Sequence, residues 1–215
     1  IDSLDFQLVR TKLIAAQKTS ADALSYFEQA VHGAKFGNPI AQRYGLVLSL
    51  LRAQNITRAS AEMQQLQTLV KNNPFIDTLA GRVNEANKKT SEILAFYRSA
   101  VQNHPQHRAL VYAYAEALLQ ANQADLASKI LAERVNRYPA DTRLYQLQAR
   151  AYAAQNKQLE HHQALAYSAA WQGNLGGAIE QLELAKQAGG NFYQMSIIES
   201  DLNELRDMLG ARKKK

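Results

Sequence analysis

The sequence has 215 residues, 47% of them hydrophobic, and no cysteine, so it can bury a sizeable core but forms neither disulfides nor thiolate metal sites. The formal net charge is +6, but Arg212 and the three lysines after it supply four of these charges, which leaves +2 for the rest. A nucleic-acid-binding fold would carry its excess charge on a folded face. We therefore interpret residues 210–215 as a solvated basic tail, and the longest apolar run, Tyr44 to Leu51, is far too short to cross a membrane.

Residues 1–38 are predicted to form N-terminal helices that make one degenerate repeat. Apolar residues recur at helical spacing as far as Lys18. The segment 19–22 then has N-cap character and begins a second helix. The segment 31–39 is longer than a repeat requires and contains two glycines and a proline, so we interpret it as a bend between subdomains.

Residues 39–190 are predicted to be helix pairs that repeat with a period near 34 residues. The four prolines of the chain are spaced by 35, 31 and 34 residues. Proline interrupts a helix because it lacks the backbone N–H and crowds the preceding turn. The apolar pattern has the same period, and in residues 75–105 it includes Gly81, Tyr97 and a polar turn at 87–89. Two signals of different physical origin therefore agree on the repeat.

The repeat is clearest in the stretch from Leu159 to Gly190, which predicts two helices on either side of a turn at 172–174. Ala166 and Ala178 stand where the helices approach most closely, and small residues there allow close packing by ridges and grooves. This order of small and large residues is the 34-residue tetratricopeptide (TPR) pattern. The sequence therefore predicts an all-α, TPR-like α-solenoid of about five to six antiparallel helix hairpins.

The register becomes ambiguous after Pro139. Counted from Thr142, the helix that begins at Leu159 is the second of its pair, whereas counted from Leu159 it is the first of the next pair. We interpret it as serving both neighbours. Residues 191–209 are predicted to form an amphipathic capping helix, because the last repeat must present a polar outer face.

No catalytic motif is present: the sequence has no H-E-x-x-H, no Gly-rich phosphate loop and no nucleophile elbow. We therefore expect no enzyme activity, metal or cofactor in this segment. His104 and His107 flank a proline in a predicted loop and are expected to be solvated. His161 and His162 are adjacent on a helix, so they point about 100° apart and do not chelate one ion together.

A partner-binding groove is expected along the first helix of each pair, which lines the concave side of stacked hairpins. Tyrosine and arginine are favoured in binding hot spots because both supply contact area and hydrogen-bond donors. The alternative is that the tyrosines fill gaps between repeats. A groove of this kind would bind an extended or helical segment with an affinity on the order of μM. The predicted groove residues are Tyr44, Phe75, Arg82, Tyr112, Glu116, Arg143, Gln146, Arg150, Gln163 and Tyr167.

Three features together resemble one known family: SLDFQLVRTKL at 3–13, the run of degenerate repeats, and LQARAYAAQNKQLEHHQALAYSAAWQGNLGGAIEQL at 147–182. Over essentially its whole length the chain resembles the C-terminal TPR region of the BepA-type β-barrel assembly-enhancing proteases, periplasmic zinc metallopeptidases of Gram-negative bacteria. The resemblance implies a preceding protease domain that holds the zinc, with none of the family's zinc or catalytic residues in this sequence. It also implies a periplasmic chaperone role, in which this region docks onto the outer-membrane β-barrel assembly machinery, its substrates and its own protease domain.

The chain begins at Ile1 rather than at a methionine, so we expect it to be a fragment that starts just past that domain. Two other functions stay open. One is a TPR scaffold of unrelated context, which an H-E-x-x-H motif in the preceding sequence would exclude. The other is a helical-repeat RNA binder, which requires affinity for RNA that survives removal of residues 212–215.

Overall fold

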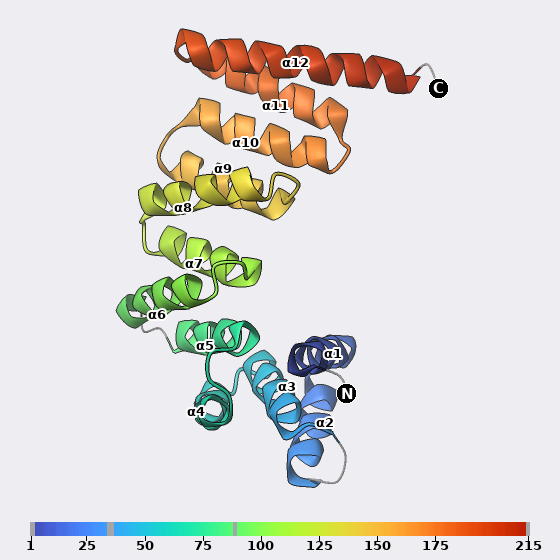
Figure 1. Ribbon diagram of the computed structural model, residues 1–215, viewed down its shortest axis with the longest axis vertical. Coiled ribbons are helices and arrows are strands. Elements are labelled where there is room, and N and C mark those ends of the chain that lie inside the picture. The colour runs from blue at the N-terminus through green and yellow to red at the C-terminus, as the bar shows by residue number, and fades with distance from the viewer. Residues whose placement is uncertain (1–2, 34–36, 88–89, 214–215) are drawn as a thin grey trace. The chain divides into compact units, whose positions relative to one another are not determined.

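The computed structural model describes residues 3–33, 37–87 and 90–213, and these form twelve α-helices and no strand (Figure 1). The prediction of an all-α repeat fold, with about five to six helix hairpins, is therefore confirmed in its class. Parts of the predicted bend at 31–39, of the polar turn at 87–89 and of the basic tail lie outside the described residues. The helices are α1 (Leu4–Gln17), α2 (Ser20–Gly33), α3 (Pro39–Arg52), α4 (Ile56–Leu69), α5 (Pro74–Ala86), α6 (Thr90–Asn103), α7 (Arg108–Gln120), α8 (Ala124–Arg137), α9 (Thr142–Ala154), α10 (Gln158–Trp171), α11 (Leu175–Ala188) and α12 (Phe192–Lys213).

The chain divides into two compact units, Ile1–Ala113 and Tyr114–Lys215. The boundary falls inside α7 rather than at the bend at 31–39, where the sequence suggested a seam. On either side of that bend, α2 and α3 pack against each other. The first unit buries a core of leucine, isoleucine and aromatic side chains from α1 to α5, and the second has a separate core between α10, α11 and α12. Among the described helices, none is both long enough and apolar enough to cross a bilayer.

One turn geometry recurs between helices. Its central residue has a left-handed backbone, and the amide of the next residue donates to the carbonyl five residues back, as from Asn55 to Leu50 at 2.9 Å. This bond closes a helix C-terminus in a Schellman motif, so the chain reverses direction within a few residues. The central residues are Gln54 (φ 57°), Asn122 (φ 57°), Asn156 (φ 58°) and Gly173 (φ 80°).

A second connection uses proline at the start of a helix. Pro39 and Pro74 begin α3 and α5, where the missing N–H costs no helical hydrogen bond. The preceding asparagines cap these helices: Asn38 Oδ1 accepts from the amide of Ile40 at 2.9 Å, and Asn73 makes the equivalent bond. Capped, proline-led starts therefore fix where both helices begin.

The left-handed turn joins the helix α10 to both of its neighbours. No proline follows Pro139 in the sequence, so neither connection begins with one. The helix α10 packs against both α9 and α11, which confirms that it serves two neighbours. At the α10–α11 crossing, Ala166 is 1% exposed and Ala178 is 0% exposed. The predicted close approach of these two helices is therefore observed.

The last helix, α12, continues beyond the predicted end at Leu209 as far as Lys213. Arg212 donates from Nη1 to the carbonyl oxygen of Gly173 at 3.1 Å, so this part of the predicted basic tail is helical and contacts the α10–α11 turn. Along its exposed side α12 forms ion pairs with α11, between Lys186 and Glu199 at 3.0 Å and between Arg206 and Glu183.

Candidate partner-binding site

The exposed face of α9 carries three of the predicted groove residues, Arg143, Gln146 and Arg150, which we call the α9 row. Their spacing of three and four residues places them on one face of the helix, and all three are exposed. Buried residues such as Tyr145 and Gln148 occupy the other face, and α9 packs against both α8 and α10. The row is therefore presented on a helix that is fixed by its neighbours.

Arg143 at one end of the row pairs with Glu116 of α7, another predicted groove residue. Its Nη2 atom lies 3.1 Å from Glu116 Oε1. The Arg143 side chain is 55% exposed, so the pair contributes at most about 1 kcal/mol to stability. The main effect of the pair is to orient the guanidinium group of Arg143 within the α9 row.

Gln163 and Tyr167 of α10 belong to a polar network that reaches α12. Gln163 Nε2 donates to Tyr167 Oη at 2.9 Å, and Tyr167 Oη donates to Asp201 Oδ2 at 2.8 Å. Burial raises the pKa of Tyr167 well above its usual value. The hydrogen bond to Asp201 and the negative charge of Asp201 raise it further. Burial also raises the pKa of Asp201, against the lowering effect of the Tyr167 hydrogen bond. The tyrosine therefore stays neutral and acts as a bridge between two helices.

Asp201 is not among the predicted groove residues, although the sequence carries a signal for it. Tyr167 and Asp201 are separated by 34 residues, and so are Glu160 and Gln194, whose side chains also join α10 to α12. Residues one repeat period apart occupy equivalent positions on successive repeats. Searching for polar pairs at that separation would have found both contacts.

The α9 row and the pair Gln163 and Tyr167 do not form one groove. Gln163 and Tyr167 line a hollow of about 240 Å³ together with Tyr145, Gln148 and Tyr152 of α9 and residues of α8. At about 100° per residue, these three α9 side chains lie on the side of the helix opposite to the row. The two groups lie apart because α10 packs on α9 as the second helix of a pair. Gln163 and Tyr167 therefore lie toward α8 and not toward the α9 row.

In the first unit, Tyr44 is a core residue and not a groove residue. It is 4% exposed, and burial raises its pKa to about 12 despite the opposing charge of Arg82. The alternative interpretation, that tyrosines fill gaps between repeats, holds at this position. Arg82 is exposed on α5, and Tyr112 is half-buried on α7.

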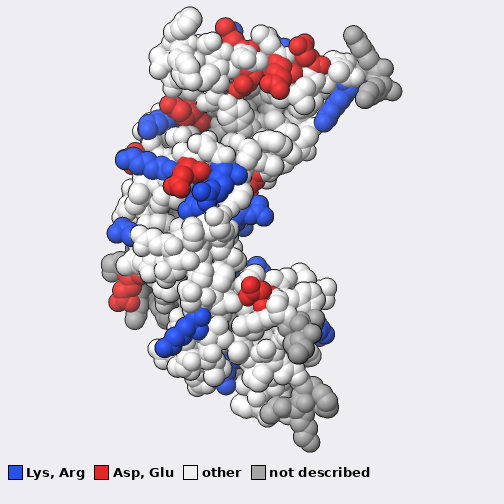
Figure 2. All heavy atoms as spheres, in the orientation of Figure 1, with Lys and Arg blue, Asp and Glu red and all other residues white. Residues whose placement is uncertain are grey.

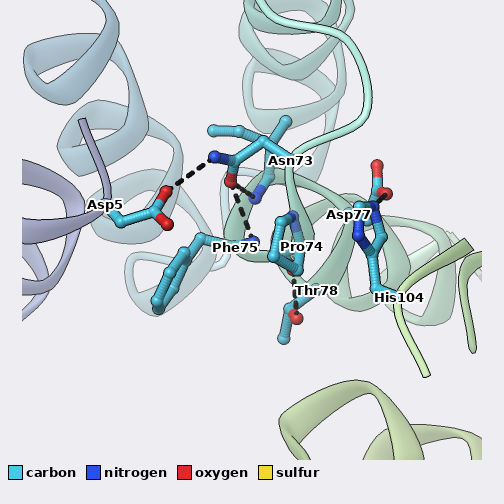
Figure 3. A network of polar contacts seen from close by, with 8 residues as sticks. Asp5, Asn73, Pro74, Phe75, Asp77, Thr78 and His104 are labelled. Carbon is cyan, nitrogen blue, oxygen red and sulfur yellow. Dashed lines mark hydrogen bonds and ion pairs between the residues drawn. The ribbon is translucent and has the colours of Figure 1, made fainter. Parts of the chain in front are cut away.

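Phe75 and the two histidines near Pro105 form a half-buried cluster, which corrects the prediction that these histidines are solvated. His104 Nε2 lies 3.1 Å from Asp77 Oδ2, and its side chain is 12% exposed (Figure 3). The rings of Phe75 and His107 meet edge to face, with centroids 4.9 Å apart. Burial raises the pKa of Asp77, although His104 opposes the shift, and burial lowers the pKa of His107.

The described residues contain no group of three or more His, Cys, Asp or Glu side chains that could hold a metal ion. The adjacent histidines of α10 point to different helices, as their spacing predicts. His161 Nδ1 lies 2.9 Å from the carbonyl oxygen of Ala149 in α9, and His162 Nδ1 lies 2.9 Å from Gln181 Oε1 in α11. Both therefore link neighbouring helices.

The charged surface is mixed. Figure 2 shows acidic side chains gathered over α11 and α12, and mainly basic ones with acidic neighbours over α8 and α9. On the face drawn, the described basic side chains do not join into one continuous stripe. A helical-repeat RNA binder would be expected to carry such a stripe.

Comparison with known proteins identifies the repeat. Residues 78–151 match the tetratricopeptide repeat family, and no curated protein matches the sequence. The fold is similar to MamA residues 41-end from Desulfovibrio magneticus RS-1, at 15% identity over 82% of this chain and 98% of that chain, with a TM-score of 0.56. It is also similar to YrrB, described as a TPR protein with an unusual peptide-binding site (14% identity, 83% and 91% covered, TM-score 0.56). A third similar structure is a thermophilic TPR protein from Thermus thermophilus (16% identity, 91% and 97% covered, TM-score 0.50). At such identities the likeness shows the fold alone.

Proposed function

We propose that this chain, which is a tetratricopeptide-repeat protein, is a non-catalytic module that binds segments of other polypeptides. The observation that carries this proposal is the α9 row, because it presents two arginines and a glutamine from a helix held on both sides. Binding sites on rigid elements hold their geometry better than sites on loops. The description of YrrB as having a peptide-binding site supports peptide recognition by this fold.

The α9 row fits a partner segment with acidic side chains. Arg143 and Arg150 are seven residues apart, which is about 10 Å along a helix, and Gln146 lies between them. A guanidinium group binds a carboxylate through two parallel hydrogen bonds, and an amide side chain both donates and accepts. We expect an affinity on the order of μM for such a segment.

We further propose that the parent protein is a BepA-type periplasmic zinc metalloprotease and chaperone. Support comes from the resemblance in residues 3–13 and 147–182. In this proposal the zinc and the catalytic groups belong to a protease domain outside this sequence, and no catalytic step is derived for this chain. Its own role would be to dock outer-membrane proteins and the β-barrel assembly machinery in the periplasm.

Site-specific photo-crosslinking in the periplasm of a Gram-negative bacterium tests both levels of the proposal. A crosslinking residue replaces Gln146 in the α9 row or, as the matched control, Lys129, an exposed residue of α8. We expect a component of the barrel-assembly machinery to be captured at position 146 and not at position 129. If other polypeptides are captured at position 146 and not at position 129, the proposal of a polypeptide-binding module is supported. The proposed role in outer-membrane protein assembly is then refuted. Equal capture at both positions, or none at either, would refute the row as the binding surface.

A further inference from the structure

The hollow between α8, α9 and α10, which we call the tyrosine hollow, is lined by Tyr145, Tyr152 and Tyr167 among others. Every residue of its lining is described and belongs to the second unit. It opens to solvent, since Asn136 in the lining is exposed and Tyr152 is half-buried. Its volume of about 240 Å³ lies below the range of about 300–1,000 Å³ common for small-molecule sites. The size therefore suits a single side chain of a partner rather than a whole ligand.

Three aromatic rings from two helices converge on this space. Tyr145 and Tyr152 are seven residues apart on α9, so they lie on one face of the helix two turns from each other. The rings of Tyr145 and Tyr167 meet edge to face, with centroids 5.6 Å apart. The face of an aromatic ring carries partial negative charge, and rings gathered around one space attract a cation.

The hydroxyl and amide groups of the lining have partners within the protein. Gln148 Nε2 donates to Tyr152 Oη at 3.4 Å, and Gln163 Nε2 donates to Tyr167 Oη at 2.9 Å. These groups are therefore not the ones that a ligand would bind. The lining groups that remain are the aromatic rings, a few apolar side chains and the carboxylate of Glu160.

The formal charge in and beside the hollow is acidic. Burial, and then the charge of Glu160, raises the pKa of Tyr152, so the carboxylate lies near that ring. A second carboxyl group, that of Asp201, lies behind Tyr167, with its Oδ2 atom 2.8 Å from the hydroxyl oxygen. Among the described side chains, no lysine or arginine lines the hollow or forms an ion pair with Glu160. A partner group with a positive charge would therefore complement this site.

The hydrogen bonding of Glu160 favours one kind of cation. Gln194 Nε2 donates to Glu160 Oε1 at 3.3 Å, so Oε2 is the oxygen that is left for a partner. A guanidinium group binds a carboxylate best through both oxygens, whereas the ammonium group of lysine is a compact charge that needs only one. The methylene groups of a lysine can also lie along apolar surface, which the rings, Val135 and Ala164 provide.

We propose that the tyrosine hollow binds one lysine side chain of a partner polypeptide, with its methylene groups against the tyrosine rings and its ammonium group at Glu160. A single side chain contributes little affinity, so we expect a Kd on the order of mM for a short lysine peptide. The hollow lies on the side of α9 opposite to the α9 row. This proposal therefore goes beyond the binding of acidic segments at the row, and each site can be tested without the other.

The test is an NMR titration of the whole ¹⁵N-labelled chain with the blocked peptide acetyl-Ser-Lys-Ser-amide. In the matched control peptide, norleucine replaces lysine, which keeps the four side-chain carbons and removes only the ammonium group. We expect the amide signals of Tyr152, Glu160 and Gln163 to shift. The norleucine peptide should bind about tenfold more weakly, because it forms neither the cation–π contacts nor the ion pair.

Three results would overturn the proposal. The first is equal binding of the lysine and norleucine peptides, because the hollow would then select only for an apolar side chain. The second is a set of shifts that lies outside the hollow. The third is tighter binding of the arginine counterpart, because both oxygens of Glu160 would then be available.

Two pairs of variants locate the site. Glu160→Gln should reduce the affinity for the lysine peptide about tenfold, whereas Glu180→Gln, at an exposed residue outside the lining, should change it less than about twofold. Tyr152→Leu should weaken binding about fivefold, whereas Tyr152→Phe keeps the ring and should retain it. Unchanged melting temperatures show that the variants fold, and the Glu160 pair decides alone if Tyr152→Leu does not fold. Equal effects within a pair of folded variants would refute the assignment to this hollow.

Discussion

The hairpin α10–α11 and the pair α1–α2 are built from helices of the same length, 14 residues each, but different turns join them. In α10–α11 the turn centres on Gly173 with φ 80°, and an alanine is buried on each helix, Ala166 and Ala178. In α1–α2 the chain leaves α1 at Lys18 in an extended conformation, with φ −95° and ψ 156°. The two pairs therefore differ in the residue at the turn, which is left-handed in one and extended in the other.

The largest expected effect comes from filling the closed crossing. Ala178→Leu should overpack the contact with α10 and lower the free energy of unfolding by about 1–3 kcal/mol, because the site is fully buried. Urea unfolding measures this difference. The matched change Ala30→Leu adds the same atoms at a half-buried position of α2 and should alter stability by less than about 0.5 kcal/mol. Equal losses in the two variants would refute the contrast between the buried crossing of α10–α11 and this position of α2.

Glycine to alanine changes test how closely α2 packs on α3. Gly45→Ala should lower the free energy of unfolding by about 1–2 kcal/mol, because its Cβ atom would lie 2.3 Å from the Phe27 ring. Gly176→Ala in α11 meets no atom and should raise it by about 0.5–1 kcal/mol, as expected for a compatible helical site. Thermal unfolding compares the two. A stabilising Gly45→Ala would mean that the ring does not pack on α3 as described.

A smaller effect is expected at the contact that holds α1 on α3. Arg52→Gln removes the cap on the last carbonyls of α1 and should cost about 1 kcal/mol, with faster amide hydrogen exchange confined to α1. Arg58→Gln removes only a surface ion pair and should cost less than about 0.5 kcal/mol. Exchange that speeds up uniformly through the first unit would contradict a local role for Arg52.

The smallest effect is a pH dependence of the first unit. Burial lowers the folded-state pKa of His107 below its usual 6.5, so the unfolded chain takes up the proton first as the pH falls. Stability is therefore lost as the pH falls through 6.5, until the folded-state pKa is reached. His107→Gln should remove this part of the slope in urea unfolding between pH 7 and 5. Asp77, whose pKa is raised, acts with the opposite sign at lower pH.

The closed hairpins could be predicted from the sequence because their signals are local. Ala166, Ala178 and the turn at Gly173 lie within one repeat, and the starts of α3 and α5 follow from an asparagine before a proline. The burial of His104 and His107 could not be predicted, since it depends on Asp77 and Phe75, about 30 residues earlier along the chain.

The candidate site was predicted only in part, for a reason visible in the turns. The connections at 155–157 and 172–174 have the same left-handed centre, so spacing alone does not say which face of α10 lines a groove. Gln163 and Tyr167 were assigned to the groove on one of the two registers, and in the structure they line a hollow with residues of α8 and α9. The prediction for Tyr44 was wrong for a different reason. Position within a helix does not reveal how far a tyrosine is covered by its neighbours.

The left-handed turn also affects how well the sequence of such a chain can be matched to a repeat family. A family profile compares side chains, whereas the turn demands a dihedral angle that glutamine, asparagine and glycine all supply here. Of the four turn centres, only Asn122 lies within the stretch 78–151 that matches the repeat family, yet the backbone at the other three is alike. In this protein, different residues adopt the same turn conformation. The repeated backbone geometry is therefore found also where the sequence does not match the family.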